Sequence, residues 1–319
     1  MITQRKHALG IVGVGLALVL AACGGDDGDQ TDDGAAAEER GELTVGGATF
    51  AEMAIMQEMY RALLEDAGYT VTIQAVENRE IYEPALESGE IDIVPEYAAT
   101  MAEFLNAKVN GPDAPSESPV ATNDAAETVA NMQPLAEELG LRVLEPSGAA
   151  NQNGFVVSQE FSDANGGIST LSELSELGQP LVLAAVEECP DRPFCQPGLE
   201  QTYGLEFTEI LPLGFGSPQT KEAVAGGDAQ LGLVGTTDGT LDDYGLVLLE
   251  DDQNLQLADN LVPVVNAETA GDETISDVLN QLAGVLTTED LAALNAAVDA
   301  ERQLPEDVAR QYLEDNGLL

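Results

Sequence analysis

The side chains of this chain offer little for covalent or acid–base catalysis. The only histidine is His7, which lies in an N-terminal segment that is expected to be removed. Without imidazole, histidine-assisted serine or cysteine hydrolysis and zinc sites that use histidine are excluded. Pairs of carboxylates could transfer protons, but among 58 acidic residues such a pair is not a specific signal. The sequence therefore predicts no catalytic residue, no metal site and no cofactor, and it favours a protein that is not an enzyme.

Cys23 could carry a lipid. It ends an apolar stretch over residues 8–22 that follows Arg5 and Lys6. This stretch is shorter than the roughly 20 apolar residues needed to cross a bilayer, so residues 1–22 are predicted to form a secretory signal. A cysteine at the cleavage position resembles a bacterial lipobox, in which the thiol receives a diacylglyceryl group. We expect a protein anchored by lipid on the extracytoplasmic face of the cell membrane, with a plain secretory signal as the alternative.

Cys189 and Cys195 are two further thiols, six positions apart around Pro190 and Pro193. Because an exported chain meets an oxidising compartment, a small disulfide loop is expected. A reactive thiol pair is the alternative.

The chain is strongly acidic, with a formal charge of −47 from 58 acidic and 11 basic residues. Nucleic acid is therefore excluded as a partner. Such a surface is typical of proteins that work in high salt, where ions screen the repulsion between carboxylates, although ordinary solubility would also account for it.

The order of predicted elements indicates two α/β lobes behind a polar tether. Residues 23–41 are rich in Gly and Asp and have no apolar period, so they are expected to form the tether. Strands are then predicted at 42–45, 69–75 and 91–94, with helices from 52 and from 80 between them, which is typical of a parallel sheet. Such sheets bind ligands at the carboxyl ends of their strands, here residues 46–50 and 95–100. The same alternation restarts with strands at 155–157, 181–184, 207–211 and 231–234, which predicts a second lobe.

Five short segments occur in an order that is specific even though each is weak alone. They are Gly47–Glu52, Ser88–Tyr97, Thr236–Gly239, Leu246–Asp252 and Glu306–Leu319. Together they resemble the solute-binding subunits of quaternary-amine (glycine betaine, choline, carnitine) ABC importers, over essentially all of residues 43–319.

The resemblance implies a two-lobed periplasmic-binding-protein fold of type II, with a mixed, mainly parallel sheet in each lobe and a two-strand hinge. Residues 42–153 and 247–319 would form lobe 1, and residues 154–246 lobe 2. The chain would cross between lobes near residues 153–157 and 246–251. The implied partners are ABC permease and ATPase subunits, and a monomer is expected.

The resemblance also implies an aromatic cage for a quaternary ammonium, which has no N–H to donate and is held by ring faces. Tyr97 matches the family's cage position, and packing at the rim is its alternative role. Phe50, Phe194 and Tyr82 could supply further faces. The aromatic residue that the family often has before its Ser-Thr-Asp-Gly segment is Gly235 here, and the lysine of its opening turn is Ala48, so the cage is thinned.

A zwitterionic ligand would also need a partner for its carboxylate. Arg192 stands where the family places an arginine. Further polar candidates are the hydroxyls and amides at the strand ends and crossing, with loop capping as their alternative role, and two residues of a family ligand loop that rank lower: Thr236, Thr237, Asn151, Gln152, Asn153, Asn78 and Arg79.

The resulting hypothesis is a receptor that captures a quaternary-amine solute and delivers it to a permease. The thinned cage leaves open the same transport role for another small amine or an amino-acid-like solute. An extracellular enzyme on the same fold and a structural adhesin are alternatives from other classes, but the first lacks a nucleophile motif and the second would not need two hinged lobes.

Overall fold

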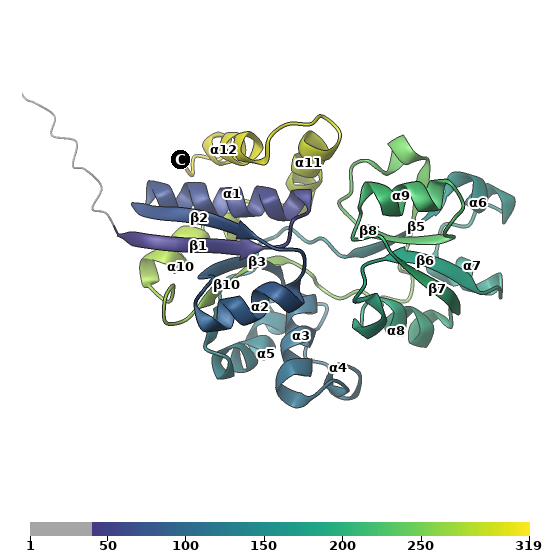
Figure 1. Ribbon diagram of the computed structural model, residues 1–319, viewed down its shortest axis with the longest axis horizontal. Helices are drawn as coiled ribbons and strands as arrows, with labels where there is room; N and C mark the ends of the chain where they lie inside the picture. Colours follow the sequence, from purple (N-terminus) through teal and green to yellow (C-terminus); the bar gives the residue numbers. More distant parts are fainter. Residues whose placement is uncertain (1–39) are drawn as a thin grey trace, which may run out of the picture. The chain divides into compact units, whose positions relative to one another are not determined.

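The computed structural model describes residues 40–319 and shows two five-stranded sheets, each with its own helices (Figure 1). The predicted signal, Cys23 and nearly all of the predicted tether lie outside the described residues. The described chain therefore bears on the two lobes alone.

The first sheet has the strand order β2-β1-β3-β10-β4. β1, β2 and β3 are parallel, whereas β10 runs antiparallel to both β3 and β4. The bounds are Gly41–Gly47 for β1, Tyr69–Ala75 for β2, Ile93–Tyr97 for β3, Leu141–Val143 for β4 and Leu261–Asn266 for β10.

Helices cover both faces of this sheet and complete the first lobe (Figure 1). One core contains residues of α1 (Ala51–Asp66), α10 (Glu273–Leu279), η4 (Leu282–Gly284), α11 (Thr288–Asp299) and α12 (Pro305–Asp315). The other contains residues of α2, Arg79–Ser88, α3, Ala98–Asn110, and α5, Ala125–Glu138, with the short α4, Ala114–Glu117, beside them.

Helix α1 illustrates how the sequence builds this lobe. Its apolar residues recur at helical spacing, and Met53, Met56, Met59 and Tyr60 are almost completely buried. This helix was predicted from that period and is confirmed. Its N-cap is Phe50, so the start of α1 lies directly after the carboxyl end of β1.

The second sheet has the strand order β7-β6-β8-β5-β9 and forms the second lobe. β6 is parallel to β7 and β8, and β5 is antiparallel to β8 and β9. The strands are β5 (Asn153–Ser158), β6 (Leu181–Ala185), β7 (Phe207–Pro212), β8 (Leu231–Gly235) and β9 (Leu246–Leu249). The helices are α6 (Gln159–Ala164), α7 (Leu171–Glu176), η1 (Cys189–Asp191), α8 (Gln196–Gly198), η2 (Leu199–Tyr203), α9 (Pro218–Ala225) and η3 (Leu241–Tyr244).

Each sheet is mixed and mainly parallel, as predicted, because four of its five strands run in the same direction. The antiparallel pairings all involve β5 or β10. These two strands follow the segments that cross between the lobes, so they enter their sheets in the direction opposite to that of the parallel core.

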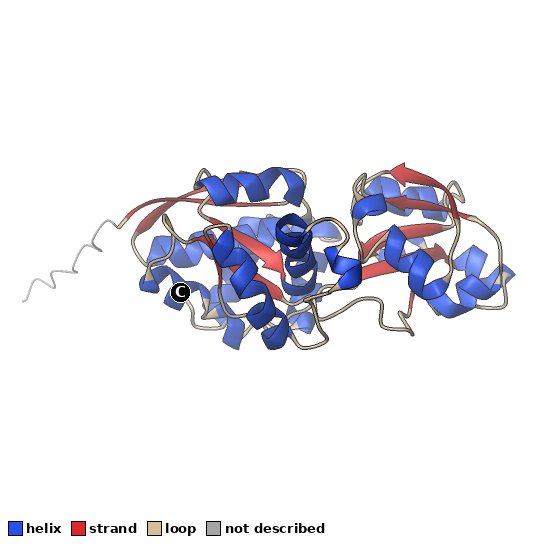
Figure 2. Cartoon of the chain, turned by 90° about the horizontal axis from the view of Figure 1, so that it is seen from below, coloured by secondary structure: helices blue, strands red, loops and turns tan. Residues whose placement is uncertain are grey.

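Two segments, residues 144–152 and 250–260, cross between the lobes, and Figure 2 shows them as loops. They form an isolated antiparallel bridge at Ala150 and Asn260, and the Asn151 N–H donates to the Asp259 carbonyl at 3.2 Å. The first crossing thus precedes the predicted 153–157, because that stretch is β5. The second follows β9, which pairs with β5 throughout, so the boundary predicted after residue 246 divides a strand of the second lobe.

Candidate functional site

A cleft of about 1300 Å³ is lined by residues of both lobes. In the first lobe, the cleft is lined at the carboxyl ends of two strands, where the sequence analysis expected a ligand: Phe50 follows β1, and Tyr97 is the last residue of β3. The placement follows from the parallel arrangement of β1 and β3, whose carboxyl ends lie on one edge of the sheet.

Aromatic rings line this cleft from both lobes. Three of them, Tyr97, Phe50 and Phe194, are candidates from the sequence, whereas Phe215, which follows β7, was not considered there. The ring centroids of Phe50 and Phe215 lie 5.3 Å apart at an interplanar angle of 50°, a favourable tilted contact. This pair joins the lobes, because Phe50 belongs to the first lobe and Phe215 to the second.

Tyr82, considered as a further aromatic face, also lines the cleft and takes part in a buried hydrogen bond. Its side chain is 4% exposed, and its hydroxyl donates to Glu96 at 2.6 Å. Burial and the neighbouring Glu96 carboxylate raise the pKa of the Tyr82 phenol, so it remains a donor. The Tyr82 hydroxyl thus adds a donor to the Glu96 carboxylate, which also forms a buried ion pair with Arg79.

The buried carboxylate of Glu52 is the polar centre of the site. Glu52 lies in the first turn of α1, is 2% exposed, and accepts a hydrogen bond from the Tyr97 hydroxyl. Its other donors are the Asn151 amide at 2.9 Å, the Thr237 hydroxyl at 2.8 Å and the Asn295 amide at 2.6 Å. These partners come from the first lobe, a crossing segment and the second lobe, so one carboxylate connects the aromatic site to the hinge.

Tyr97 is held as a hydrogen-bond donor in this network. Burial and the adjacent Glu52 carboxylate raise the pKa of its phenol well above the usual value. The phenol therefore stays neutral, and its ring keeps the negatively polarised faces that attract a cation.

A second buried network lies around Arg79. Its guanidinium binds both oxygens of Glu96, at 2.7 and 2.6 Å, and donates to the Thr100 hydroxyl at 2.9 Å. Asp259, 4% exposed, accepts from the Thr100 N–H at 3.0 Å. Burial raises the pKa of Asp259 to about 7, against opposing contributions from the Thr100 N–H and Arg79. This carboxyl group can therefore change its charge near neutral pH.

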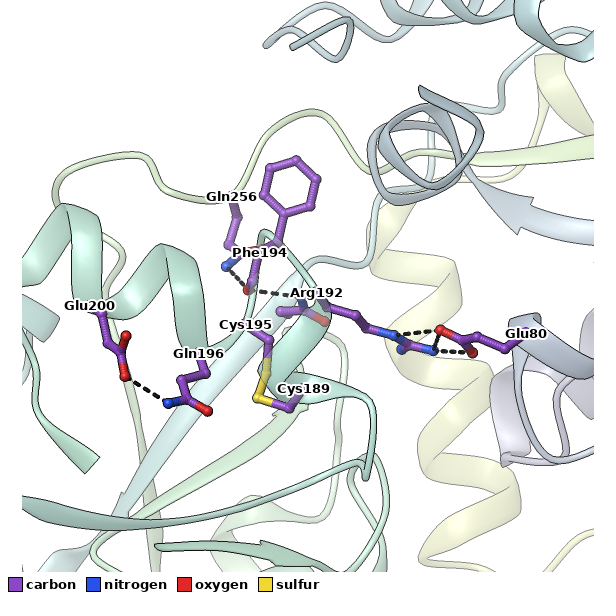
Figure 3. Close-up of a disulfide and its surroundings, with 9 residues drawn as sticks. Glu80, Cys189, Arg192, Phe194, Cys195, Gln196, Glu200 and Gln256 are labelled. Carbon is purple, nitrogen blue, oxygen red and sulfur yellow. Dashed lines mark hydrogen bonds and ion pairs between the residues drawn. A yellow bond between two sulfur atoms is a disulfide. The ribbon is translucent and has the colours of Figure 1, made fainter. Parts of the chain in front are cut away.

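Cys189 and Cys195 form the disulfide that was predicted, and the loop that it closes carries Arg192 and Phe194 (Figure 3). The Phe194 carbonyl accepts from Asn153 at 3.2 Å and from Gln256 at 2.9 Å, which fixes the loop to the first residue of β5 and to the second crossing. The covalent closure and these two bonds limit the positions that the Arg192 and Phe194 side chains can take.

The guanidinium of Arg192 points from this loop to Glu80 on α2 of the first lobe (Figure 3). Its contacts to the two carboxylate oxygens are 3.1 and 2.9 Å long. Both side chains are about one third exposed. The group predicted to bind a ligand carboxylate is thus already paired with a carboxylate of the protein.

The remaining predicted polar residues separate into two groups. Thr237, Asn151 and Asn153 line the cleft, with the first two bound to Glu52 and the third to the Phe194 carbonyl. Thr236, in the turn after β8, is exposed and is not among the residues that line the cleft. The prediction for Thr236 is therefore corrected, and its hydroxyl accepts instead from the Gln152 N–H at 3.0 Å.

The lower-ranked Asn78 also lines the cleft, and its amide donates to Glu188 of the second lobe. At Gly235 the structure leaves no space for the aromatic residue that the resemblance suggested. A Cβ atom there would lie 2.7 Å from the Asn151 side-chain oxygen. The Asn151 amide therefore occupies the space that a ring would need.

Sequence reasoning missed Phe215, Asp259, Asn295 and the role of Glu52. Glu52 was visible as the last residue of the segment Gly47–Glu52, but nothing local indicated its four donors. Within residues 40–319, no group of three His, Cys, Asp or Glu side chains is arranged to hold a metal ion.

Comparison with known proteins places this geometry among solute receptors. A family model described as the substrate binding domain of ABC-type glycine betaine transport systems matches residues 41–315. A glycine-betaine-binding protein of Pseudomonas aeruginosa is 30% identical over 292 residues, which are 87% of this chain and 88% of that protein.

Two solved structures are similar over nearly their whole length. The crystal structure of a glycine betaine/carnitine/choline ABC transporter protein has a TM-score of 0.62 at 20% identity, covering 87% of this chain and 98% of its own. The apo form of YehZ from Escherichia coli has a TM-score of 0.58 at 26% identity, covering 87% and 99%.

Proposed function

This chain belongs to the family of substrate-binding domains of ABC-type glycine betaine transport systems, and on that premise we propose that it captures a quaternary amine between its lobes and delivers it to an ABC permease. The bound solute would be glycine betaine, choline, carnitine or a close relative. The protein would act with permease and ATPase subunits, without catalysing a reaction itself.

One observation carries the proposal: rings from both lobes, Tyr97 and Phe50 from the first, Phe194 and Phe215 from the second, line one cleft together with buried carboxylates. A quaternary ammonium is attracted by ring faces, by about 0.5–2 kcal/mol per contact. A solute that touches both sets of rings has higher affinity for the arrangement in which the lobes approach each other, and therefore favours it. A permease could then distinguish the loaded receptor from the empty one.

We also infer that the protein is held by a diacylglyceryl group on Cys23, outside the cytoplasm, as a monomer. None of the helices within residues 40–319 is both long and apolar enough to cross a membrane. A lipid at the end of the predicted tether of residues 23–41 would keep the receptor near its permease.

Calorimetric titration of the purified protein with glycine betaine, choline and carnitine tests the proposal. We expect at least one of them to bind with a micromolar or lower Kd. If no quaternary amine gave a binding signal and an amino acid or a simple primary amine did, the receptor would be assigned to another solute.

A further inference from the structure

The charges that line the cleft are unequal. Among the residues of the 40–319 range that line it, eleven are acidic and three are basic. Carboxylates around a cavity with low-dielectric walls attract cations and repel anions. An excess of carboxylates by itself is also found on ordinary solvated surfaces. Whether the cleft selects a cationic ligand therefore depends on the partners of its three basic side chains and on any polar atom that has no partner.

Each of the three basic side chains is paired with carboxylates of the protein. Arg79 binds both oxygens of the buried Glu96. Lys108 contacts Glu83 and, at 2.9 Å, Glu87. Arg192 binds both oxygens of Glu80. A ligand carboxylate entering the cleft would have to displace a protein carboxylate from one of them.

Arg79 cannot be freed cheaply, because both it and Glu96 are buried, and breaking such a pair leaves an uncompensated charge. Lys108 is held by two acidic partners. Of the two arginine pairs that line the cleft, that of Arg192 with Glu80 is the more exposed, and it is the one that a ligand carboxylate could open. Arg192 and Glu80 therefore control whether the cleft can accept an anionic group.

An unpaired acceptor gives the second, independent indication. The side-chain oxygen of Asn295 is buried and has no hydrogen-bond partner among the described residues, while its nitrogen donates to Glu52 at 2.6 Å. Asn295 is 5% exposed and lines the cleft. The contact of the nitrogen with Glu52 fixes the amide orientation, because an oxygen in that place would face a carboxylate. A buried acceptor without a donor is costly, so a small movement of the covering atoms that brought a ligand hydroxyl to this oxygen would be favoured.

Asn295 also lies close to the aromatic site. Its amide and the Tyr97 hydroxyl bind the two oxygens of the same Glu52 carboxylate. A trimethylammonium group on the Tyr97 ring and a hydroxyl directed to Asn295 would belong to one small molecule.

We propose that the cleft selects a small quaternary ammonium that carries a hydroxyl and no carboxylate, so that choline is bound in preference to glycine betaine. The inference rests on the proposed function, since it specifies the solute of the same cleft. Glycine betaine has the same trimethylammonium group, but its carboxylate meets acidic neighbours and it has no hydrogen to donate to Asn295.

The test compares choline and glycine betaine by calorimetry on the wild-type protein and on Glu80→Gln. We expect wild-type protein to bind choline at least tenfold more tightly. Glu80→Gln releases Arg192, so its affinity for glycine betaine should rise about fivefold or more, while that for choline falls slightly. Glu77→Gln is the matched control: Glu77 lines the same cleft and is exposed, and its replacement removes one charge without freeing Arg192.

Ionic strength provides a readout that needs no variant. The affinity for choline should fall as salt screens the carboxylates, whereas that for the electroneutral glycine betaine should change little.

The outcomes separate the two levels of the proposal. Glycine betaine bound as tightly as choline, or a salt dependence equal for both, would overturn the selectivity and leave the quaternary-amine receptor intact. A rise in glycine betaine affinity in Glu77→Gln equal to that in Glu80→Gln would remove the role of Arg192 and overturn the selectivity mechanism. Absence of binding by every quaternary amine would overturn both the receptor and its selectivity.

Discussion

At the residue scale, Tyr97 combines two functions that belong to different parts of its side chain. The ring lines the cleft and the hydroxyl donates to Glu52, which also binds the second lobe through Thr237. A solute that contacts the Tyr97 ring is therefore connected to the second lobe through two hydrogen bonds, from Tyr97 to Glu52 and from Thr237 to Glu52.

Replacing Tyr97 separates these functions. We expect Tyr97→Ala to weaken binding of the quaternary amine by about 10- to 30-fold, because a cation–π contact of up to about 2 kcal/mol is lost. Tyr97→Phe keeps the ring and should lose less than about threefold. Calorimetry with a thermal unfolding control measures both. Equal affinities of Tyr97→Ala and wild-type protein would remove the ring from the site.

Asp259 should make stability depend on pH. Burial raises the pKa of its carboxyl group to about 7, whereas in the unfolded chain the pKa is about 4. Between these values the folded protein holds a proton that the unfolded chain has lost. The stability that this group contributes is complete below about pH 4 and is lost as the pH rises through about 7.

Asp259→Asn keeps an acceptor for the Thr100 N–H but cannot ionise. Its unfolding free energy relative to wild type should therefore rise between pH 4 and 7, by up to about 4 kcal/mol, and level off above that. Urea unfolding of both proteins at several pH values measures the difference. A difference that stays constant across this range would show that Asp259 ionises at its ordinary pKa.

At the element scale, the sequence predicted the helices and strands whose burial follows a simple period. Helix α1 was evident from its buried apolar stripe, and the strands preceding Phe50 and Tyr97 from their apolar runs. Helix α3 was not predicted, because the alanines around Met101 and Leu105 give little contrast between its faces. The antiparallel entry of β5 and β10 depends on where the chain crosses between lobes, which no local pattern encodes.

The same distinction holds for the site. Tyr97 and Phe50 lie in two of the recognisable segments, Arg192 was found from its place in the resemblance, and Asn151 from its position at a crossing. The four donors around Glu52 come from positions up to 243 residues away, so their convergence is a property of the folded chain. The pairing of Arg192 with Glu80 likewise joins positions 112 residues apart.

The disulfide loop should link stability to affinity. Cys189→Ser/Cys195→Ser opens a short loop, which should lower the free energy of unfolding by about 2 kcal/mol. We also expect severalfold weaker solute binding, because the loop positions Phe194. Chemical unfolding and calorimetry measure the two effects, and a reductant added to the double variant is the control that should change neither. Unaltered affinity would show that the hydrogen bonds from Asn153 and Gln256 hold the loop without the disulfide.

At the scale of the whole molecule, two lobes joined by two paired crossings suit a receptor, and the proposed lipid on Cys23 would determine where the receptor works. With a formal charge of −47, the protein would be repelled by an anionic membrane surface, so the proposed lipid would be what keeps it at the membrane.

Anchoring depends on Cys23 in this account. Cys23→Ser should abolish incorporation of labelled fatty acid and release the protein from the membrane fraction, while solute affinity stays unchanged because residues 40–319 contain the cleft. Metabolic labelling, fractionation and calorimetry provide the three measurements. Membrane retention of the unlabelled variant would instead indicate another mode of attachment.

The most direct test of the central claim is a crystal structure of the protein grown with choline. The account predicts the trimethylammonium group against the Tyr97 ring, in the cleft between the lobes. A cleft filled by protein side chains, or a ligand bound away from Tyr97, would contradict it.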